Sequence, residues 1–228
     1  MLADADNPEV TRAQQAAREA AARDILRRTE ETIVTVCRLE NECGAKARAS
    51  TTDVDARVTK MPDGGFRPGN NIQLAVAGKA TGGPRTIVGV DVTNLGRDMG
   101  GVTKMIDEVN EMTGAVPKHI LADGNHVRHA CLDVAAARGV DVIAPPSKRS
   151  NARTNDSAAV TAWRKRMTTD DAKRLYRGRA ALVELANAHL KSSFALDRVL
   201  VRGLGNVLCV GIIAALTFNI VRHAAAFT

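Results

Sequence analysis

The spacing of apolar residues changes along the chain from a helical period to an alternating one. In residues 11–41, which are rich in Ala, Arg and Glu, four apolar residues are spaced to line one helical face: Ala22, Leu26, Ile33 and Cys37. This spacing predicts a long amphipathic helix. A polar segment with several Gly and Pro residues follows and predicts a connector. We therefore predict an N-terminal amphipathic helical appendage and linker over residues 1–47, ahead of a larger domain over residues 48–228.

Two segments then alternate apolar with polar or small residues, the period that is typical of strands. They are "NIQLAVAG" and "TIVGVDVT", and the turn-rich stretch between them predicts an antiparallel hairpin. Val88, Val90 and Val92 share one face of the second strand, which leaves Asp91 on the opposite face.

Helices and strands alternate after this hairpin. An apolar stripe that follows a candidate N-cap at Asp98 predicts a helix ending at Gly114. "KHILAD" predicts a strand, a second apolar stripe predicts a helix ending at Gly139, and "VDVIAPP" predicts a further strand. Strand, helix and strand with short links form a parallel crossover. The expected fold class is thus α/β, with a mixed sheet flanked by helices and an interior strand that ends at Asp123.

The amount and distribution of charge along the chain indicate a class of partner. The chain has 228 residues and a net charge of +7. Residues 147–202 contain thirteen Lys and Arg against five Asp and Glu, a surplus of eight that exceeds the surplus of the whole chain. Such a local excess of cations favours a polyanionic partner.

Nothing in the sequence indicates a membrane partner. The long apolar run "VLCVGIIAALTF" has twelve residues, which is too short to span a bilayer, and predicts a buried core helix. The N-terminus lacks the basic and apolar regions of a signal peptide. We therefore expect a cytoplasmic protein.

Asp123 is the first candidate for chemistry, because it ends an apolar strand and Gly124 follows at once. One interpretation is a turn in which the carboxylate caps the next helix. The other is a ligand or metal site, since α/β sheets bind ligands at the carboxyl ends of their strands.

The segment "DAKRLYRGRAALVELANAHLKSS" holds the second candidate. On a helical wheel one broad arc is polar and contains Tyr176, Arg179, Glu184, Asn187 and Lys191. The opposite side is apolar and contains Leu175, Leu182, Leu185 and Ala186, so we expect it to pack on the sheet. A solvated helix face is the competing interpretation. Carboxylates on two separate elements suit phosphoryl transfer at divalent metals, which needs about three acids.

Several segments, in order, resemble the C-terminal half of bacterial insertion-sequence DDE transposases over about residues 48–222. They include "GVDVTNLGRDMG", "HILADGNHV" and "YRGRAALVELANAHLK". The spacing of Tyr176, Arg179, Glu184 and Lys191 is similar to the Tyr-Arg-Glu-Lys signature of that family. The resemblance implies an RNase H-like fold that cuts and joins DNA at transposon ends with Mg²⁺ or Mn²⁺.

The resemblance also implies roles for individual residues. Asp123 matches the second acid of the catalytic triad and Glu184 the third, so both are expected to be catalytic and to bind metal. Tyr176, Arg179 and Lys191 match positions that hold the transposon-end DNA. A homodimer is a further expectation that the sequence leaves open.

Two features depart from the family pattern. Asn125 and His126 stand where family members usually have Gly and Tyr. The strand with the first acid should lie upstream of the N-terminal helix, so we expect an N-terminally truncated, catalytically incomplete chain. Among possible substitutes for this first acid, Asp53 and Asp55 are better explained as solvated acids in a turn, and Asp91 is a weak candidate.

The alternative function is a non-catalytic DNA-binding remnant that uses residues 147–202, and an α/β domain without DNA affinity is a third possibility.

Overall fold

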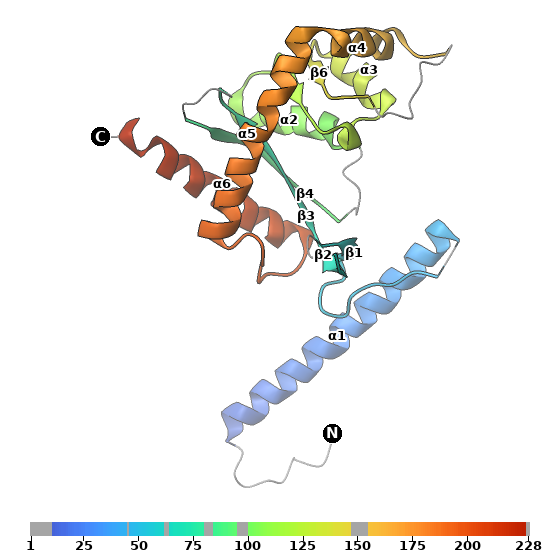
Figure 1. The fold of residues 1–228 in the computed structure, drawn as a ribbon. Helices are drawn as coiled ribbons and strands as arrows, with labels where there is room; N and C mark the ends of the chain where they lie inside the picture. The colour runs from blue at the N-terminus through green and yellow to red at the C-terminus, as the bar shows by residue number, and fades with distance from the viewer. Residues whose placement is uncertain are drawn as a thin grey trace. The chain divides into compact units, whose positions relative to one another are not determined.

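A computed structural model describes residues 11–44, 46–61, 64–79, 84–94, 100–146 and 155–226. The chain divides into two compact units, residues 1–69 and 70–228 (Figure 1). The candidate N-cap Asp98 and the first part of the basic stretch, residues 147–154, lie outside the described residues.

Helix α1 (Arg12–Cys43) dominates the first unit where a helix was predicted, but the apolar stripe behind that prediction is not a buried face, because Leu26 and Ile33 are 64% and 58% exposed. It begins with a capping box: the Thr11 hydroxyl accepts from the Gln14 N–H, and the Gln14 side chain accepts from the Thr11 N–H. Gly44 ends the helix in the left-handed region with φ of 64°. The capping box defines the N-terminus of α1 and Gly44 defines its C-terminus. These local caps matter because most of the helix is exposed.

The connector predicted after α1 contains a hairpin that we did not predict. Strands β1 (Arg57–Lys60) and β2 (Phe66–Gly69) pair antiparallel, with Val58 opposite Pro68. Only four residues of each strand pair, and Val58 and Phe66 are exposed. A run this short lacks the buried alternating face from which a strand is predicted.

The second unit contains two small sheets. Strands β3 (Asn71–Ala77) and β4 (Thr86–Thr93) form the predicted antiparallel hairpin, with Gln73 opposite Asp91 and an irregularity between Ala75 and Val76. Strands β5 (His119–Leu121) and β6 (Asp141–Ile143) pair in parallel, as the predicted crossover requires.

Helices surround these sheets. They are α2 (Gly101–Thr113), the 3-10 turn η1 (Gly124–His126), α3 (His129–Ala137), α4 (Ala158–Thr168), α5 (Asp170–Phe194), α6 (Leu204–His223) and the 3-10 turn η2 (Ala224–Ala226). The α/β class is thereby confirmed, and α2 ends at Gly114 as predicted. Helix α4 was not predicted from the sequence.

The prediction of one mixed sheet with an interior strand ending at Asp123 differs from what is observed. Among the described strands, β3 pairs with β4 alone and β5 pairs with β6 alone. No described strand lies between β3 and β5 to join their hydrogen-bonding edges. The strand that ends before Asp123 is therefore an edge strand of a two-stranded sheet.

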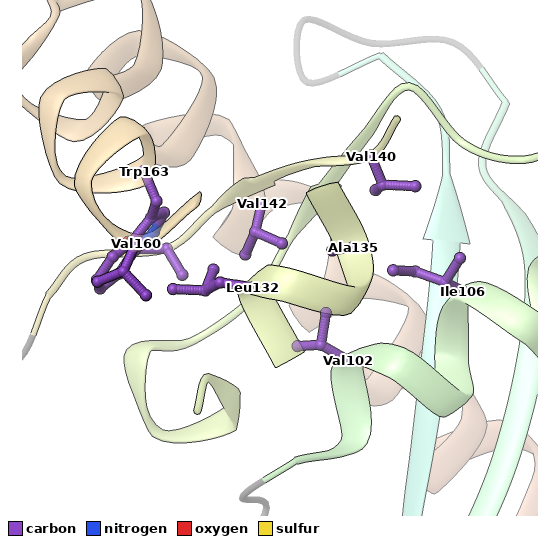
Figure 2. Close-up of a cluster of buried hydrophobic side chains, with 9 residues drawn as sticks. Val102, Ile106, Leu132, Ala135, Val140, Val142, Val160 and Trp163 are labelled. Carbon is purple, nitrogen blue, oxygen red and sulfur yellow. The ribbon is translucent and has the colours of Figure 1, made fainter. Parts of the chain in front are cut away.

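Two hydrophobic clusters stabilise the second unit. In the first, Val102 and Ile106 of α2 meet Leu132 and Ala135 of α3, and Val160 and Trp163 of α4 complete the cluster (Figure 2). In the second, Ile87 and Val90 of β4 pack with Ala186, Leu190 and Phe218 from α5 and α6. Each cluster joins a sheet to helices that are distant in sequence.

The two faces of the hairpin β3–β4 carry different helices. Gly89 faces α2, where a Cβ would lie 2.9 Å from the sulfur of Met105. Val90 faces α6, since its Cγ1 would lie 3.2 Å from a Cβ on Gly211. Successive strand residues point to opposite faces, so α2 covers one side of the hairpin and α6 the other.

Helix α6 is longer than the apolar run that predicted it. It has 20 residues, and Val207, Gly211, Ala214, Ala215 and Phe218 form its buried face, so the predicted core helix is buried on one face only. Ile213, Leu216 and Val221 are exposed. By length and composition alone α6 is able to cross a membrane, a test that core helices also pass, so it is weak evidence for a span.

Candidate functional site

A cavity of about 570 Å³ lies between β3 and β5 in the second unit. All residues of β3 and of β5 line it, and Asp123 and His126 lie at the end of the β5 side. Two helices supply the other walls: Gly101, Val102, Met105 and Val109 from α2, and Arg179, Leu182, Val183 and Asn187 from α5. The cavity thus brings together two elements that the sequence singled out, the end of β5 and helix α5.

Asp123 is half-buried on the wall of this cavity. It precedes the 3-10 turn η1, but its side chain makes no capping hydrogen bond there. Within the described part of the chain the carboxylate has no hydrogen-bond or ion-pair partner. The capping interpretation of Asp123 is therefore wrong, and its carboxylate is available to a ligand.

Gly124 turns the chain away from Asp123 at a position that no larger residue fits. A Cβ at residue 124 would lie 2.7 Å from the carbonyl oxygen of Pro145. Because that oxygen belongs to the backbone, the contact cannot be relieved by a side-chain rotation. Close approach of two backbones explains why Gly follows the carboxylate.

Helix α5 places two of its polar side chains on the cavity wall. The Thr169 hydroxyl caps its N-terminus by accepting from the Ala172 N–H. Arg179 and Asn187 then line the cavity beside Leu182 and Val183. The helical wheel had assigned Arg179 and Asn187 to the solvent side, and the structure corrects this, because the buried stripe of α5 follows Ala172, Ala186 and Leu190 instead.

The predicted apolar side of α5 is confirmed in part. Ala186 is buried against β4, whereas Leu175, which was also expected to pack on the sheet, is 42% exposed. Tyr176 is half-buried, and the guanidinium of Arg179 lies 5.6 Å from the centre of its ring. A cation over an aromatic face is attracted by the ring quadrupole, so Tyr176 helps to orient Arg179 toward the cavity.

Glu184 and Lys191 are exposed and are not part of the cavity wall. Of the five predicted site residues, Asp123 and Arg179 are therefore brought together on one cavity. Whether the Glu184 carboxylate shares a metal with Asp123 stays a prediction.

Asp91, the weak candidate for a substitute acid, has a partner of its own. It is buried, with 5% of its surface exposed, and forms an ion pair with Lys104 of α2. The ion pair places Asp91 on the α2 face of the hairpin, opposite Val90, as the alternation predicted. Removing the cation from a buried carboxylate strongly destabilises the folded protein. The pairing of Asp91 with Lys104 therefore suits a structural role.

Asp53 and Asp55 lie in the first unit, in a turn. The Asp53 carboxylate accepts a hydrogen bond from the Asp55 N–H at 3.1 Å, the geometry of an Asx turn. This agrees with the interpretation of both residues as turn acids.

The donors present do not by themselves complete a two-metal site. Among the described residues there is no group of three His, Cys, Asp or Glu side chains close enough to hold a metal ion. Asp123 supplies one carboxylate, and Mg²⁺ accepts one or two carboxylates together with water and substrate phosphate. The set at Asp123 thus fits one ligand position of a metal, not a full binding site.

Two further polar residues of the cavity were missed from the sequence. Gln73 and His126 line it, and the Gln73 amide packs against Gly101 at the start of α2. Gln73 takes a polar position in the alternation of its strand, and His126 follows Asp123 by three residues. A large polar side chain on the face opposite Ile72, Leu74 and Val76 was the signal for Gln73.

Carboxylates neutralise part of the basic stretch. Arg164 pairs with Asp156, Arg166 with Asp141, Lys173 with Asp170, and Arg174 with Asp171. The Asp156 pair is the least exposed, at 16% and 6% of the two side chains. The surplus of eight already subtracts Asp156, Asp170 and Asp171, so of these four pairs only the one between Arg166 and Asp141 lowers it further.

Comparison with known families decides the kind of domain. A family model described as "Transposase DDE domain" matches residues 46–220, well over half of the chain. The chain belongs to this DDE transposase family. No curated protein and no solved structure gives a match. The resemblance to insertion-sequence DDE transposases is thus confirmed, and the match covers both β5 with Asp123 and α5 with Glu184 in this transposase domain.

Proposed function

We propose that this transposase domain binds transposon-end DNA in the cytoplasm and supplies part of the catalytic site for strand cleavage and transfer. The observation that carries the proposal is the carboxylate of Asp123, which has no partner among the residues that the structure describes, on a cavity whose wall also includes Arg179. A carboxylate suits a divalent ion such as Mg²⁺ or Mn²⁺, and a guanidinium suits the phosphate that such an ion would bind.

We propose roles in metal or DNA binding for the three other predicted site residues, Glu184, Lys191 and Tyr176. Glu184 is exposed on α5, one residue after Val183 of the cavity wall, and is proposed as a further acid. Lys191 lies seven residues beyond Glu184 on the same helix and is exposed to a phosphate backbone. Tyr176 is proposed to contact DNA while it orients Arg179.

We propose further that residues 1–228 do not cut DNA by themselves. Two divalent ions bring four positive charges close together, and carboxylates must offset their repulsion. Asp123 and Glu184 are two acids, and Asp91 is engaged by Lys104. With too few acids for two ions, the rate should fall by several powers of ten, since each 1.4 kcal/mol is about tenfold.

A nicking assay tests this proposal. The chain is incubated with end-containing duplex DNA and Mg²⁺ or Mn²⁺, beside an Asp123→Asn, Glu184→Gln double variant. The expected result is DNA binding without nicking by either protein. Nicking by the wild type that the double variant lacks would overturn the proposed inactivity and support both acids as catalytic.

The second candidate function is a non-catalytic DNA-binding protein that uses residues 147–202. The exposed cations of α5, such as Lys191, favour it independently of any acid. It predicts that the double variant binds DNA as the wild type does, with or without divalent metal. Metal-dependent binding that is absent in Asp123→Asn would favour the catalytic site instead.

A further inference from the structure

We infer that the second unit has a further binding site for phosphate groups, at the end of the hairpin β3–β4 where α5 and α6 meet it. Four basic side chains make up this site, which we call the basic cluster: Arg85, His189, Arg222 and His223. The ligand is a phosphate group, either of a DNA backbone or of free phosphate. The inference goes beyond the proposed function, because no member of the basic cluster lines the cavity with Asp123.

Three elements bring the basic cluster together. His189 lies on α5, Arg222 and His223 lie in the last turn of α6, and Arg85 immediately precedes β4. The Thr86 Oγ1 lies 2.8 Å from the His223 Nε2, and the Arg222 Nη2 lies 3.0 Å from the His189 Nε2. The start of β4, α5 and α6 are therefore in direct contact at this end of the hairpin (Figure 1).

An aromatic ring holds two members of the basic cluster in place. Phe218 is 2% exposed, and the centre of the His189 ring lies 6.3 Å from the centre of its ring in a T-shaped arrangement. The guanidinium carbon of Arg222 lies 5.6 Å from the centre of the same ring, where the ring quadrupole attracts a cation. Both basic groups are thus oriented before any ligand binds, which lowers the entropy cost of binding.

No carboxylate balances these charges within the described part of the chain. Helix α6 contains no Asp or Glu, and Arg222 contacts the ring nitrogen of His189 instead of an acid. A guanidinium has five N–H donors and no acceptor, so one contact with His189 leaves most donors of Arg222 for a ligand. Planar guanidinium groups match the oxygens of a phosphate and bind them with charge-assisted hydrogen bonds.

Arg85 adds a buried donor without an acceptor. Its Nε is buried and has no hydrogen-bond partner among the described residues. The side chain packs between the hairpin and α5, since a Cβ on Gly78 would lie 3.3 Å from the Arg85 Cγ and 3.4 Å from the Leu182 Cδ2. Buried donors are nearly always hydrogen-bonded, so an unpaired one indicates an acceptor such as a bound anion.

The dipole of α6 explains only part of the basic cluster. The C-terminal end of a helix carries partial negative charge, which favours Arg222 and His223 in the last turn of α6. This effect is confined to the last turn, and His189 lies before the last turn of α5, whereas Arg85 belongs to no helix. A bound phosphate accounts for all four basic groups.

A nucleic-acid backbone is one source of this phosphate, and this part of the inference rests on the proposed DNA binding. His189 lies ten residues beyond Arg179 on α5, which is about 15 Å along the helix. Each strand of duplex DNA carries one phosphate for about every 3.4 Å of axis, so a single duplex reaches from Arg179 to the basic cluster. DNA would then be held at two places on the second unit.

The test follows the imidazole NMR signals of His189 and His223 in the full 228-residue chain at constant pH and ionic strength. Inorganic phosphate is one probe, and duplex DNA of about 20 base pairs is the other. We expect saturable shifts with both probes and at least tenfold tighter binding of the duplex. Arg222→Gln should weaken phosphate binding at least fivefold. Arg18→Gln makes the same change of charge at an exposed position of α1 and should leave phosphate binding unchanged.

Arg85→Met separates binding from a structural role. It removes the unpaired donor, so it should weaken phosphate binding without lowering the melting temperature. A lower melting temperature with unchanged phosphate binding would contradict the place of Arg85 in the site.

The two probes distinguish the sources of the phosphate. Shifts with both probes that Arg222→Gln weakens would support a DNA backbone as the ligand. Shifts with inorganic phosphate alone would assign the basic cluster to free phosphate, and duplex binding that leaves His189 unshifted would keep the proposed DNA binding while excluding this part of the inference. Shifts with neither probe, or shifts that Arg222→Gln leaves unchanged, would overturn the inference.

Discussion

The side-chain amide of Asn219 exchanges two hydrogen bonds with the backbone of Ile87, 132 positions away in sequence. Its oxygen accepts from the Ile87 N–H at 2.7 Å, and its nitrogen donates to the Ile87 carbonyl at 2.8 Å. Helix α6 therefore completes the outer edge of β4 as a further strand would. This interaction connects the C-terminal helix to the hairpin.

We predict that Asn219→Leu destabilises the chain. The Ile87 N–H and carbonyl would be left without partners, and each unsatisfied buried group costs about 1–3 kcal/mol. Urea unfolding should show a lower midpoint with an unchanged slope. Asn206→Leu is the control, because the exposed Asn206 amide, in the first turn of α6, donates to the carbonyl of Arg202, which precedes the helix. Equal effects of the two changes would contradict the prediction.

Replacement of Gly124 and of Gly205 by Ala should change the stability of the chain in opposite directions. Gly124→Ala places a Cβ 2.7 Å from the Pro145 carbonyl oxygen and should destabilise the chain by about 1–3 kcal/mol through overpacking. Gly205 lies in α6 with nothing within 4 Å of a Cβ, so Gly205→Ala should stabilise by about 0.5–1 kcal/mol. Thermal unfolding of both variants measures the opposite signs. A tolerated Ala at residue 124 would mean that the chain moves away from Pro145 at little cost.

Glu108 provides a pH-dependent prediction. Partial burial raises the pKa of its carboxyl above the usual 4.5, and the negative charges of Glu111, Asp91 and Asp107 add to the shift, while Lys104 opposes it. The folded state then binds the proton more tightly than the unfolded state, so this group lowers stability as pH rises from the unfolded pKa through the folded one.

Glu108→Gln should therefore stabilise the protein at pH 7 and lose that advantage below about pH 4.5. The gain should be small, because solvent screens the charges around this partly exposed carboxyl. Urea midpoints of wild type and variant between pH 4 and pH 8 measure it, and the two curves should converge at low pH. A constant difference across that range would exclude titration of Glu108 as the cause.

DNA affinity should depend steeply on salt if the basic stretch binds phosphates. The slope of log affinity against log salt is about −0.9 per neutralised phosphate of duplex DNA. Charge reversal at Arg179 and Lys191 should make the slope less steep by about that amount for each phosphate that the variant no longer neutralises. Lys60→Glu, in β1 of the first unit, reverses one charge outside residues 147–202 and serves as the comparison for each single reversal at Arg179 or Lys191. A salt-independent affinity would favour a domain without DNA-binding function.

The sequence by itself determined the local elements of this domain. The 3.6-residue and two-residue periods predicted α2, α3 and α5 and the strands β3 to β6, because one buried face imposes a regular spacing on apolar residues. Helix α1 was predicted from a stripe in which Leu26 and Ile33 are exposed. The exposed hairpin β1–β2 has no such face. In α4 the buried Val160 and Trp163 supply only a weak helical period. The order of motifs also determined the family, which the match over residues 46–220 confirms.

Only the tertiary structure decided how the elements combine. The sequence placed Arg179 among solvent-facing residues, but packing of Ala186 and Leu190 turned it toward the cavity with Asp123. It could not show that Lys104 pairs with Asp91, or that Asp123 makes no cap, because each depends on residues from another element or on the path of a turn. Local periods fix which face of an element is buried, whereas edge pairing and side-chain partners are set by contacts between distant segments. For that reason the described part of the second unit has two separate two-stranded sheets where one continuous sheet was predicted.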